Sequence, residues 1–185
     1  PFEFRPYRLA KKAKAGVDFI QTQLIYNVPK FKEFMKRVVD LGVHEKVYIL
    51  AGAGPLKTVG AAKYMRDSVP GLDVPDEIVT RMEATGKGIE DKKAKAEAAR
   101  EEGIKICLEL IQQMREIPGV AGVHIMAIEW EEAIAKITER AGFLPRPAAD
   151  HWALPVPRTT PPGRSFRSMG ASSRSTPTPA PAAQI

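Results

Sequence analysis

The amino-acid sequence predicts an α/β fold built on a parallel β-sheet. Three short apolar segments have the pattern of buried strands, and each is followed by a turn and a segment with one apolar helical face. An open doubly wound sheet and a closed barrel both fit this alternation. Three strands are too few for a stable parallel sheet covered on both faces. We therefore expect a segment of a larger α/β fold, completed by an N-terminal portion outside this chain or, less favoured, by another copy.

The first half of the chain is expected to hold two strands. A helix over residues 2–15 begins raggedly and ends at Gly16, with lysines in its last turns. The first strand covers residues 19–25. Pro29 begins an amphipathic helix that runs to Leu41. The second strand follows at residues 46–51.

The second half contains most of the expected helix. Thr58 caps a short helix to about residue 65. Val74 and Pro75 open another helix, and a long one runs from about residue 88 to 116, charged at first and apolar later. The third strand covers residues 123–128, and a last helix covers residues 131–141.

Charge and composition exclude several classes of protein. The formal net charge is +6, but from Pro145 onward there are five arginines and one acid, which leaves about +2 for the rest. A phosphate-binding face needs clustered cations, so nucleic acid is not expected as a partner. The sequence has no apolar run of membrane-spanning length and no signal-peptide pattern. A single cysteine, Cys107, expected to be a small buried apolar residue, fits a reducing compartment. These features predict a cytoplasmic protein.

The last part of the chain differs from the rest. Nine of the sixteen prolines lie from Pro145 onward, among many Ser, Thr and Ala residues. Such a segment cannot form a core, so residues 146–185 are expected to be a disordered tail after a single domain over residues 1–145.

The first strand carries polar residues where a ligand is expected. Strict alternation places Gln21 and Gln23 on one face, and Thr22 and Leu24 on the other. Burial of an amide without partners costs a few kcal/mol, so a polar ligand or a hydrogen-bonded network should face the two glutamines. Amides suit the mixed donor and acceptor edge of a pterin, whereas pairing within a packed interior is the alternative.

Three other segments are weaker candidates. The Gly52–Pro55 turn lets the backbone approach either a ligand or a packed neighbour, but it is not a phosphate-binding loop. His124 lies in the third strand and is expected to be a hydrogen-bonded core residue. Glu129 or Trp130 could face a pocket at the exit of that strand. No histidine or carboxylate pattern has metal-ligand spacing, so no metal is predicted.

Three segments, in order, resemble methylenetetrahydrofolate reductases. Residues 8–12 (RLAKK), 15–16 (AG) and 19–23 (FIQTQ) are similar to the segment before and through the sixth strand of that family. Residues 49–56 (ILAGAGPL) resemble the seventh strand and its loop, and residues 122–127 (GVHIMA) resemble the eighth. The resemblance covers roughly residues 1–145 and implies the last three β/α units of a TIM (β/α)8 barrel.

The resemblance also implies a chemistry. The family binds FAD and reduces 5,10-methylenetetrahydrofolate to 5-methyltetrahydrofolate, and NAD(P)H then reduces the flavin again. Gln23 matches a folate-contacting glutamine, and Gln21 is expected to bind the substrate beside it. Lys12 matches a lysine near the FAD phosphates, and Arg8 and Arg5, one and two turns earlier, occupy positions of polar FAD contacts.

The departures from the family are equally informative. A glutamine after the seventh strand is Ala61 here, and an arginine after the eighth is replaced around Trp130. The family's catalytic glutamate and most FAD contacts come from the first five strands, so no catalytic residue is predicted and the chain alone is expected to be inactive. It would act with a partner that supplies the missing half of the barrel, or as a homo-oligomer. The alternatives are a non-catalytic folate- or flavin-binding module and an unrelated barrel enzyme for a phosphorylated substrate.

Overall fold

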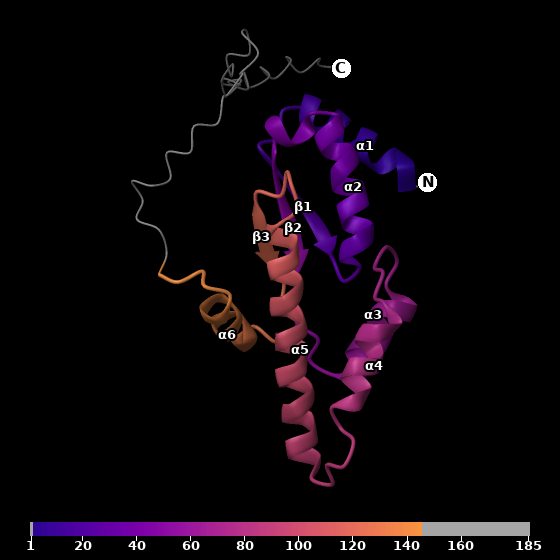
Figure 1. Ribbon diagram of the computed structural model, residues 1–185, viewed down its shortest axis with the longest axis vertical. Helices are drawn as coiled ribbons and strands as arrows, with labels where there is room; N and C mark the ends of the chain where they lie inside the picture. Colours follow the sequence, from indigo (N-terminus) through magenta and orange to yellow (C-terminus); the bar gives the residue numbers. More distant parts are fainter. Residues whose placement is uncertain (1, 146–185) are drawn as a thin grey trace, which may run out of the picture.

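The computed structural model describes residues 2–145 and contains a three-stranded parallel sheet with helices packed against it (Figure 1). The strands are β1 (Phe19–Leu24), β2 (Tyr48–Ala53) and β3 (Gly122–Ile125), with β2 in the centre. Both pairings are parallel, which confirms the predicted α/β class. The expected tail at residues 146–185 lies outside the described residues.

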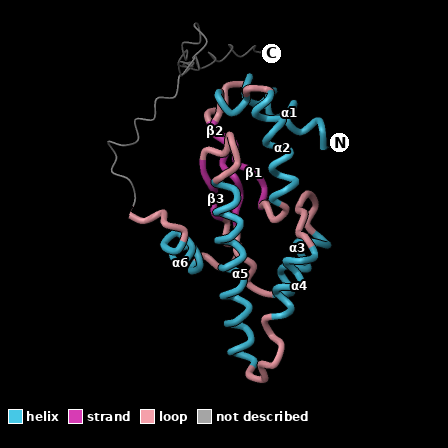
Figure 2. The backbone as a smooth tube through the Cα atoms, viewed as in Figure 1, coloured by secondary structure: helices cyan, strands magenta, loops and turns pink. Residues whose placement is uncertain are grey.

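Helices occupy most of the rest of residues 2–145 (Figure 2). They are η1 (Phe2–Phe4), α1 (Arg5–Lys14), α2 (Val28–Asp40), η2 (Val43–Glu45), α3 (Val59–Ser68), α4 (Asp76–Ala84), α5 (Lys92–Arg115) and α6 (Glu132–Arg140). None of the helices described is long and apolar enough to cross a lipid bilayer.

The third strand is shorter than the sequence pattern predicts. The ladder to β2 ends with Ala53 opposite Ile125, and the Met126 N–H makes one further bond to the Ala53 carbonyl. The chain then turns, and Glu129 has a positive φ of 55° that no strand contains. The alternating apolar pattern continued through this turn and gave no sign of it.

Residues 2–145 cover one face of the sheet and leave the other uncovered. Ile49 and Ala51 of β2 are fully buried within the hydrophobic core, and α5 packs along β2 and β3. Phe19 and Gln21, on the opposite face according to the register of β1 with β2, are exposed, Phe19 by 54%. The described part of the chain therefore buries one side of a parallel sheet, although such sheets are normally covered on both.

Helix α5 crosses the exit of β2 at one close contact. A Cβ built on Gly103 would lie 1.8 Å from the Leu56 carbonyl oxygen, so only glycine fits. The N-terminal half of α5 extends past the sheet and packs against α4 (Figure 1). Arg81 of α4 forms ion pairs with Glu102 and Glu109 of α5, both at 2.6 Å.

The contact at Gly103 yields a prediction about stability. Gly103→Ala should lower the free energy of unfolding by about 3 kcal/mol, because the methyl group must displace either α5 or the β2–α3 loop. Chemical denaturation monitored by circular dichroism would measure this loss. Gly60→Ala in α3 is the matched control, since its Cβ would meet only Thr58 Oγ1 at 3.7 Å. An equally small effect of both substitutions would show that α5 does not depend on this contact.

Candidate functional site

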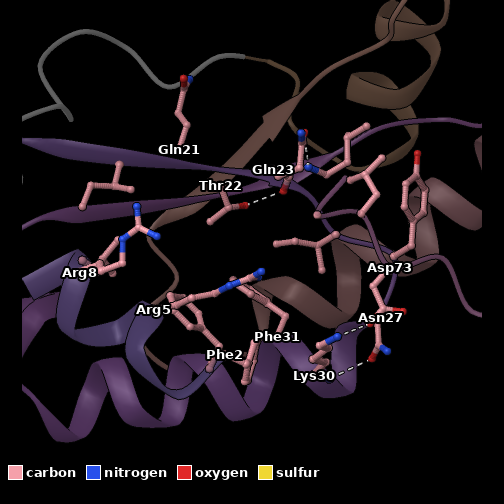
Figure 3. Close-up of a pocket in the computed structure, with 18 of the residues that line it drawn as sticks. Phe2, Arg5, Arg8, Gln21, Thr22, Gln23, Asn27, Lys30, Phe31 and Asp73 are labelled. Carbon is pink, nitrogen blue, oxygen red and sulfur yellow. Dashed lines mark hydrogen bonds and ion pairs between the residues drawn. The ribbon is translucent and has the colours of Figure 1, made fainter. Parts of the chain in front are cut away.

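A cavity of about 590 Å³ lies beside β1, which forms one edge of the sheet (Figure 3). It is lined by α1, β1, the start of α2 and the loop at residues 71–73. The cavity brings together all five residues that the sequence singled out as ligand-binding: Arg5, Arg8, Lys12, Gln21 and Gln23. Residues of α1 and residues of β1, which are separate elements in the sequence, therefore line the same cavity.

The cationic side of the cavity comes from α1. Arg5, Arg8 and Lys12 are three and four residues apart, so they share one face of this helix. Within residues 2–145 none of the three forms an ion pair with a carboxylate. Arg5 instead lies over the ring of Phe2, with its guanidinium carbon 5.6 Å from the centroid. These charges are available to an anionic ligand.

The register between β1 and β2 shifts after Gln21. Gln21 pairs with Leu50 of β2, but Leu24 rather than Gln23 pairs with Gly52, so β1 contains one additional residue. This is a β-bulge. The bulge shifts the pairing by one residue, but Leu24 is buried in the core whereas Gln21 is exposed, as expected for side chains on opposite faces.

Side chains complete the hydrogen bonding at the bulge. The Thr22 hydroxyl accepts a hydrogen bond from the Gly52 N–H at 2.8 Å and donates one to the Gln23 carbonyl oxygen at 2.8 Å. The Gln23 carboxamide oxygen accepts from the Leu24 N–H at 3.0 Å. Figure 3 shows Gln21 and Gln23 projecting from the side of β1 opposite Arg5 and Arg8. The residues that line the cavity therefore lie on two sides of β1, with the amides on one side and the cations on the other.

The glycines at the end of β2 and just after it have a packing role. A Cβ on Gly52 would lie 2.5 Å from the Gln23 carbonyl oxygen, and one on Gly54 would lie 2.5 Å from the Met126 carbonyl oxygen. Neither glycine lines the cavity. Of the two interpretations of this turn, close packing against neighbouring strands is the one that the structure supports.

Sequence reasoning missed an aromatic cluster in the cavity wall. The Phe2 and Phe34 ring centroids are 6.4 Å apart, and Phe31 stacks on Phe34 at 6.1 Å. The Lys30 ammonium lies 5.6 Å from the Phe2 centroid and forms an ion pair with Asp73 at 2.5 Å. The spacing of Phe31 and Phe34 indicated only a buried helix face, and nothing in the sequence placed Phe2 beside them.

The cavity is electrostatically positive. Its lining contains four basic side chains and one acidic one, Asp73. The ion pair with Lys30, helped by a hydrogen bond from Asn27, holds the pKa of Asp73 below its usual range, so this carboxylate stays ionised at neutral pH. The net positive charge favours a ligand that carries phosphate or carboxylate groups.

The remaining candidates do not form part of the cavity. Trp130 is 9% exposed and packs in the core, so the expectation that it or Glu129 faces the pocket is wrong for this cavity. The Lys57 ammonium donates to the Glu129 carbonyl oxygen at 2.9 Å and holds the turn after β3. His124 Nδ1 is buried without a hydrogen-bond partner among the described residues, in contrast to the predicted bonded core histidine. Residues 2–145 contain no group of three side chains suited to a metal ion.

Cys107 is the buried apolar residue that the sequence predicted. Burial raises the pKa of its thiol to about 12, so the reactive thiolate is absent at neutral pH. Tyr26 nearby is also buried, and its hydroxyl donates to the Gly54 carbonyl oxygen at 3.3 Å. Burial raises the pKa of this phenol as well. Neither group is suited to acid–base or nucleophilic chemistry.

Known proteins match this chain along most of the described part. The family model described as methylenetetrahydrofolate reductase matches residues 4–142. Methylenetetrahydrofolate reductase 2 of Saccharomyces cerevisiae is 29% identical over 138 residues, and its namesake in Schizosaccharomyces pombe is 27% identical over 140. Methylenetetrahydrofolate reductase 1 of Schizosaccharomyces pombe is 25% identical over 136 residues. Each match covers 74% of this chain but 21% of the relative, so the chain spans about a fifth of the length of these proteins.

The Lys30–Asp73 pair at the cavity predicts a pH dependence. Because the pKa of Asp73 is lowered in the folded state, the pair stabilises the fold above the ordinary aspartate pKa of about 3.9, and this contribution is lost on acidification below it. Asp73→Asn should therefore make the fall in thermal midpoint between about pH 5 and pH 3 less steep. Asp18→Asn is the control, because Asp18 forms no ion pair in the described part. Equal slopes in both variants would show that the pair contributes nothing.

Proposed function

The chain belongs to the methylenetetrahydrofolate reductase family, and on that premise we propose that it forms the folate- and flavin-binding side of such an oxidoreductase. The reaction is the reduction of 5,10-methylenetetrahydrofolate to 5-methyltetrahydrofolate with NAD(P)H as electron donor. The observation that carries the proposal is the single cavity lined by Gln21, Gln23 and the three cations of α1. Because the chain belongs to this family, the alternative of an unrelated barrel enzyme for a phosphorylated substrate is not proposed.

The proposed architecture is the last three β/α units of a (β/α)8 barrel, spanning residues 1–145. Three features support it. The strands follow sequence order in a parallel sheet, one face of that sheet is uncovered, and β1 and β3 each have one side without a strand partner within the described residues. The exposed aromatic side chains of Phe4, Tyr7 and Phe19 would be covered by further chain.

The proposed substrate contacts are the two glutamine amides. Gln23 and Gln21 are among the residues that line the cavity, and their side chains project from the uncovered side of β1, which would become the inner side in a closed barrel (Figure 3). A pterin ring offers both donors and acceptors along its edge, and carboxamides can pair with it in a fixed orientation. Uncharged hydrogen bonds of this kind distinguish the ring from other planar molecules of similar size.

The charge of the α1 residues is opposite to that of the phosphates of a flavin dinucleotide, which supports this helix as the proposed flavin site. Lys12, Arg8 and Arg5 would hold the pyrophosphate, and the rings of Phe2 and Phe34 offer an apolar surface to an aromatic group. The chemistry that FAD supplies when bound is hydride donation to the one-carbon group of the folate. The chain's own groups orient the ligands and balance their charge.

Within the cavity lining the Asp73 carboxylate is paired with Lys30, which lowers its pKa, and burial raises the pKa of the Tyr26 phenol, so both are poorly suited to proton transfer. We propose that turnover requires catalytic residues outside these 185 residues. They would come from the rest of a longer polypeptide or from a partner chain that pairs with the free edges of β1 and β3. The chain should therefore be tested both alone and together with a polypeptide that supplies five further β/α units.

Flavin absorbance and folate turnover test this proposal. The assembled protein should purify with bound flavin and oxidise NADH or NADPH in the presence of 5,10-methylenetetrahydrofolate. A colourless assembly that takes up no added flavin would contradict the proposal. An assembly that binds flavin and folate without turnover would instead support a non-catalytic binding module.

A charge substitution in α1 gives a sharper prediction for the flavin site. Lys12→Ala should weaken FAD binding by about tenfold or more, because it removes a charge-assisted contact to phosphate. Fluorescence titration of the apoprotein with FAD measures the dissociation constant. Lys11→Ala is the matched control, since Lys11 is exposed in the same turn and does not line the cavity. Equal losses from the two substitutions would indicate a diffuse charge effect and no phosphate site at Lys12.

A further inference from the structure

The bulge in β1 leaves one backbone donor of β2 without its normal partner. In a regular parallel ladder the Gly52 N–H would donate to a carbonyl oxygen of β1. Here it donates to the Thr22 hydroxyl at 2.8 Å, and the next regular bond is donated by the Ile25 N–H to the Gly52 carbonyl oxygen at 2.9 Å. The Thr22 hydroxyl therefore takes the place of a backbone carbonyl as the hydrogen-bond acceptor. As a result, β1 and β2 remain hydrogen-bonded to each other at the bulge.

The same hydroxyl fixes the residue that follows it. Its proton is donated to the Gln23 carbonyl oxygen at 2.8 Å, which holds the peptide group of Gln23 against Gly52. A Cβ on Gly52 would lie 2.5 Å from this carbonyl oxygen, so the position also depends on the glycine. Thr22 uses both its donor and an acceptor lone pair inside the protein.

The orientation of the Gln23 carboxamide follows from this arrangement. Its oxygen accepts a hydrogen bond from the Leu24 N–H at 3.0 Å, so the acceptor of the amide already has a partner within β1. The two amide N–H groups make no hydrogen bond to the described residues. Gln23 thus offers the cavity a hydrogen-bond donor.

We propose that Thr22 is a positioning residue that sets Gln23 as a donor toward an acceptor atom of the substrate, such as a ring carbonyl oxygen or an unprotonated ring nitrogen. The inference rests on the proposed function, in which Gln23 contacts the folate. Thr22 acts through Gln23 and does not itself touch the reacting atoms. Without its hydroxyl, both the Gly52 N–H and the Gln23 peptide lose their partners, and the carboxamide loses its fixed direction.

Steady-state kinetics of the assembled enzyme with 5,10-methylenetetrahydrofolate test the role of Thr22. Thr22→Val keeps the shape of the side chain but removes the hydroxyl, and it should raise the KM for the folate by about tenfold with little change in kcat or flavin content. Thr22→Ser keeps the hydroxyl and should return the KM to within about twofold of the unsubstituted enzyme. A Thr22→Ser variant that is as impaired as Thr22→Val would overturn the inference.

A double-mutant cycle separates positioning from a structural role. If Thr22 acts through Gln23, Thr22→Val should cause no additional rise in KM when Gln23 is already alanine, whereas a general loss of structure would add to it. Additive effects would overturn the inference. Gln23→Glu tests the donor separately, because a carboxylate can still accept from the Leu24 N–H but offers no donor to the ligand. It should raise the KM at least as much as Gln23→Ala, and a normal KM would also overturn the inference.

The single variant Gln23→Ala distinguishes the inference from the function on which it rests. An unchanged KM in Gln23→Ala would remove Gln23 from the folate site and refute that part of the proposed function. A raised KM in Gln23→Ala, with a normal KM in Thr22→Val, would refute only the positioning role. The tests on Gln23→Ala and Gln23→Glu do not depend on whether Thr22→Val folds well, because both variants leave the Thr22 hydrogen bonds in place.

Discussion

The close approach of β1 to β2 at Gly52 is the contact on which the rest of the cavity depends. The Gln23 carbonyl oxygen occupies the space that any side chain at position 52 would need, and the Thr22 hydroxyl binds the Gly52 N–H. The additional residue in β1 then fits beside the shorter path of β2. Beyond the bulge Leu24 lies in the core, and Gln23 is exposed at the cavity. The bulge thus shifts the pairing with β2, while the exposed amide and the buried leucine still face opposite sides of the strand.

The exit of β2 is fixed by a comparable contact on its other side. The backbone of Leu56 lies directly against Gly103 of α5, and no side chain separates them. Gly52 and Gly103 thus let β2 and its exit lie close to β1 in one place and to α5 in another. Contacts of backbone against backbone leave little freedom, since neither partner has a rotamer to change. The amide side of the cavity therefore rests on a rigid part of the molecule.

The spacing of apolar residues and the residues typical of helix ends predicted the strands and helices well. Neither pattern could predict the bulge in β1. The three strands and the main helices lie close to the expected residues, and the five ligand-binding candidates converge on one cavity. Strict alternation assumes that each residue has one partner across the ladder, whereas a bulge is set by the neighbouring strand, here by Gly52. The packing of Trp130 and the place of Phe2 are also tertiary effects. The packing of Trp130 and the place of Phe2 depend on which helices and strands meet in space, and the residue pattern along the chain does not show these contacts.

The free edge of β1 determines how one ligand could contact both sides of the cavity. Gln21 and Gln23 project from one side of β1, and Arg5 and Arg8 lie on the other (Figure 3). In the proposed barrel a further strand would pair with this edge and separate the two sides along most of its length. A ligand that bridges them must then pass over the carboxyl end of β1, where ligands of parallel α/β folds bind. An extended molecule with an anionic centre meets this condition and a compact one does not. Under the proposed function two ligands would divide the two sides, with the dinucleotide at the cations and the folate ring at the amides, and they would meet only over this end of β1.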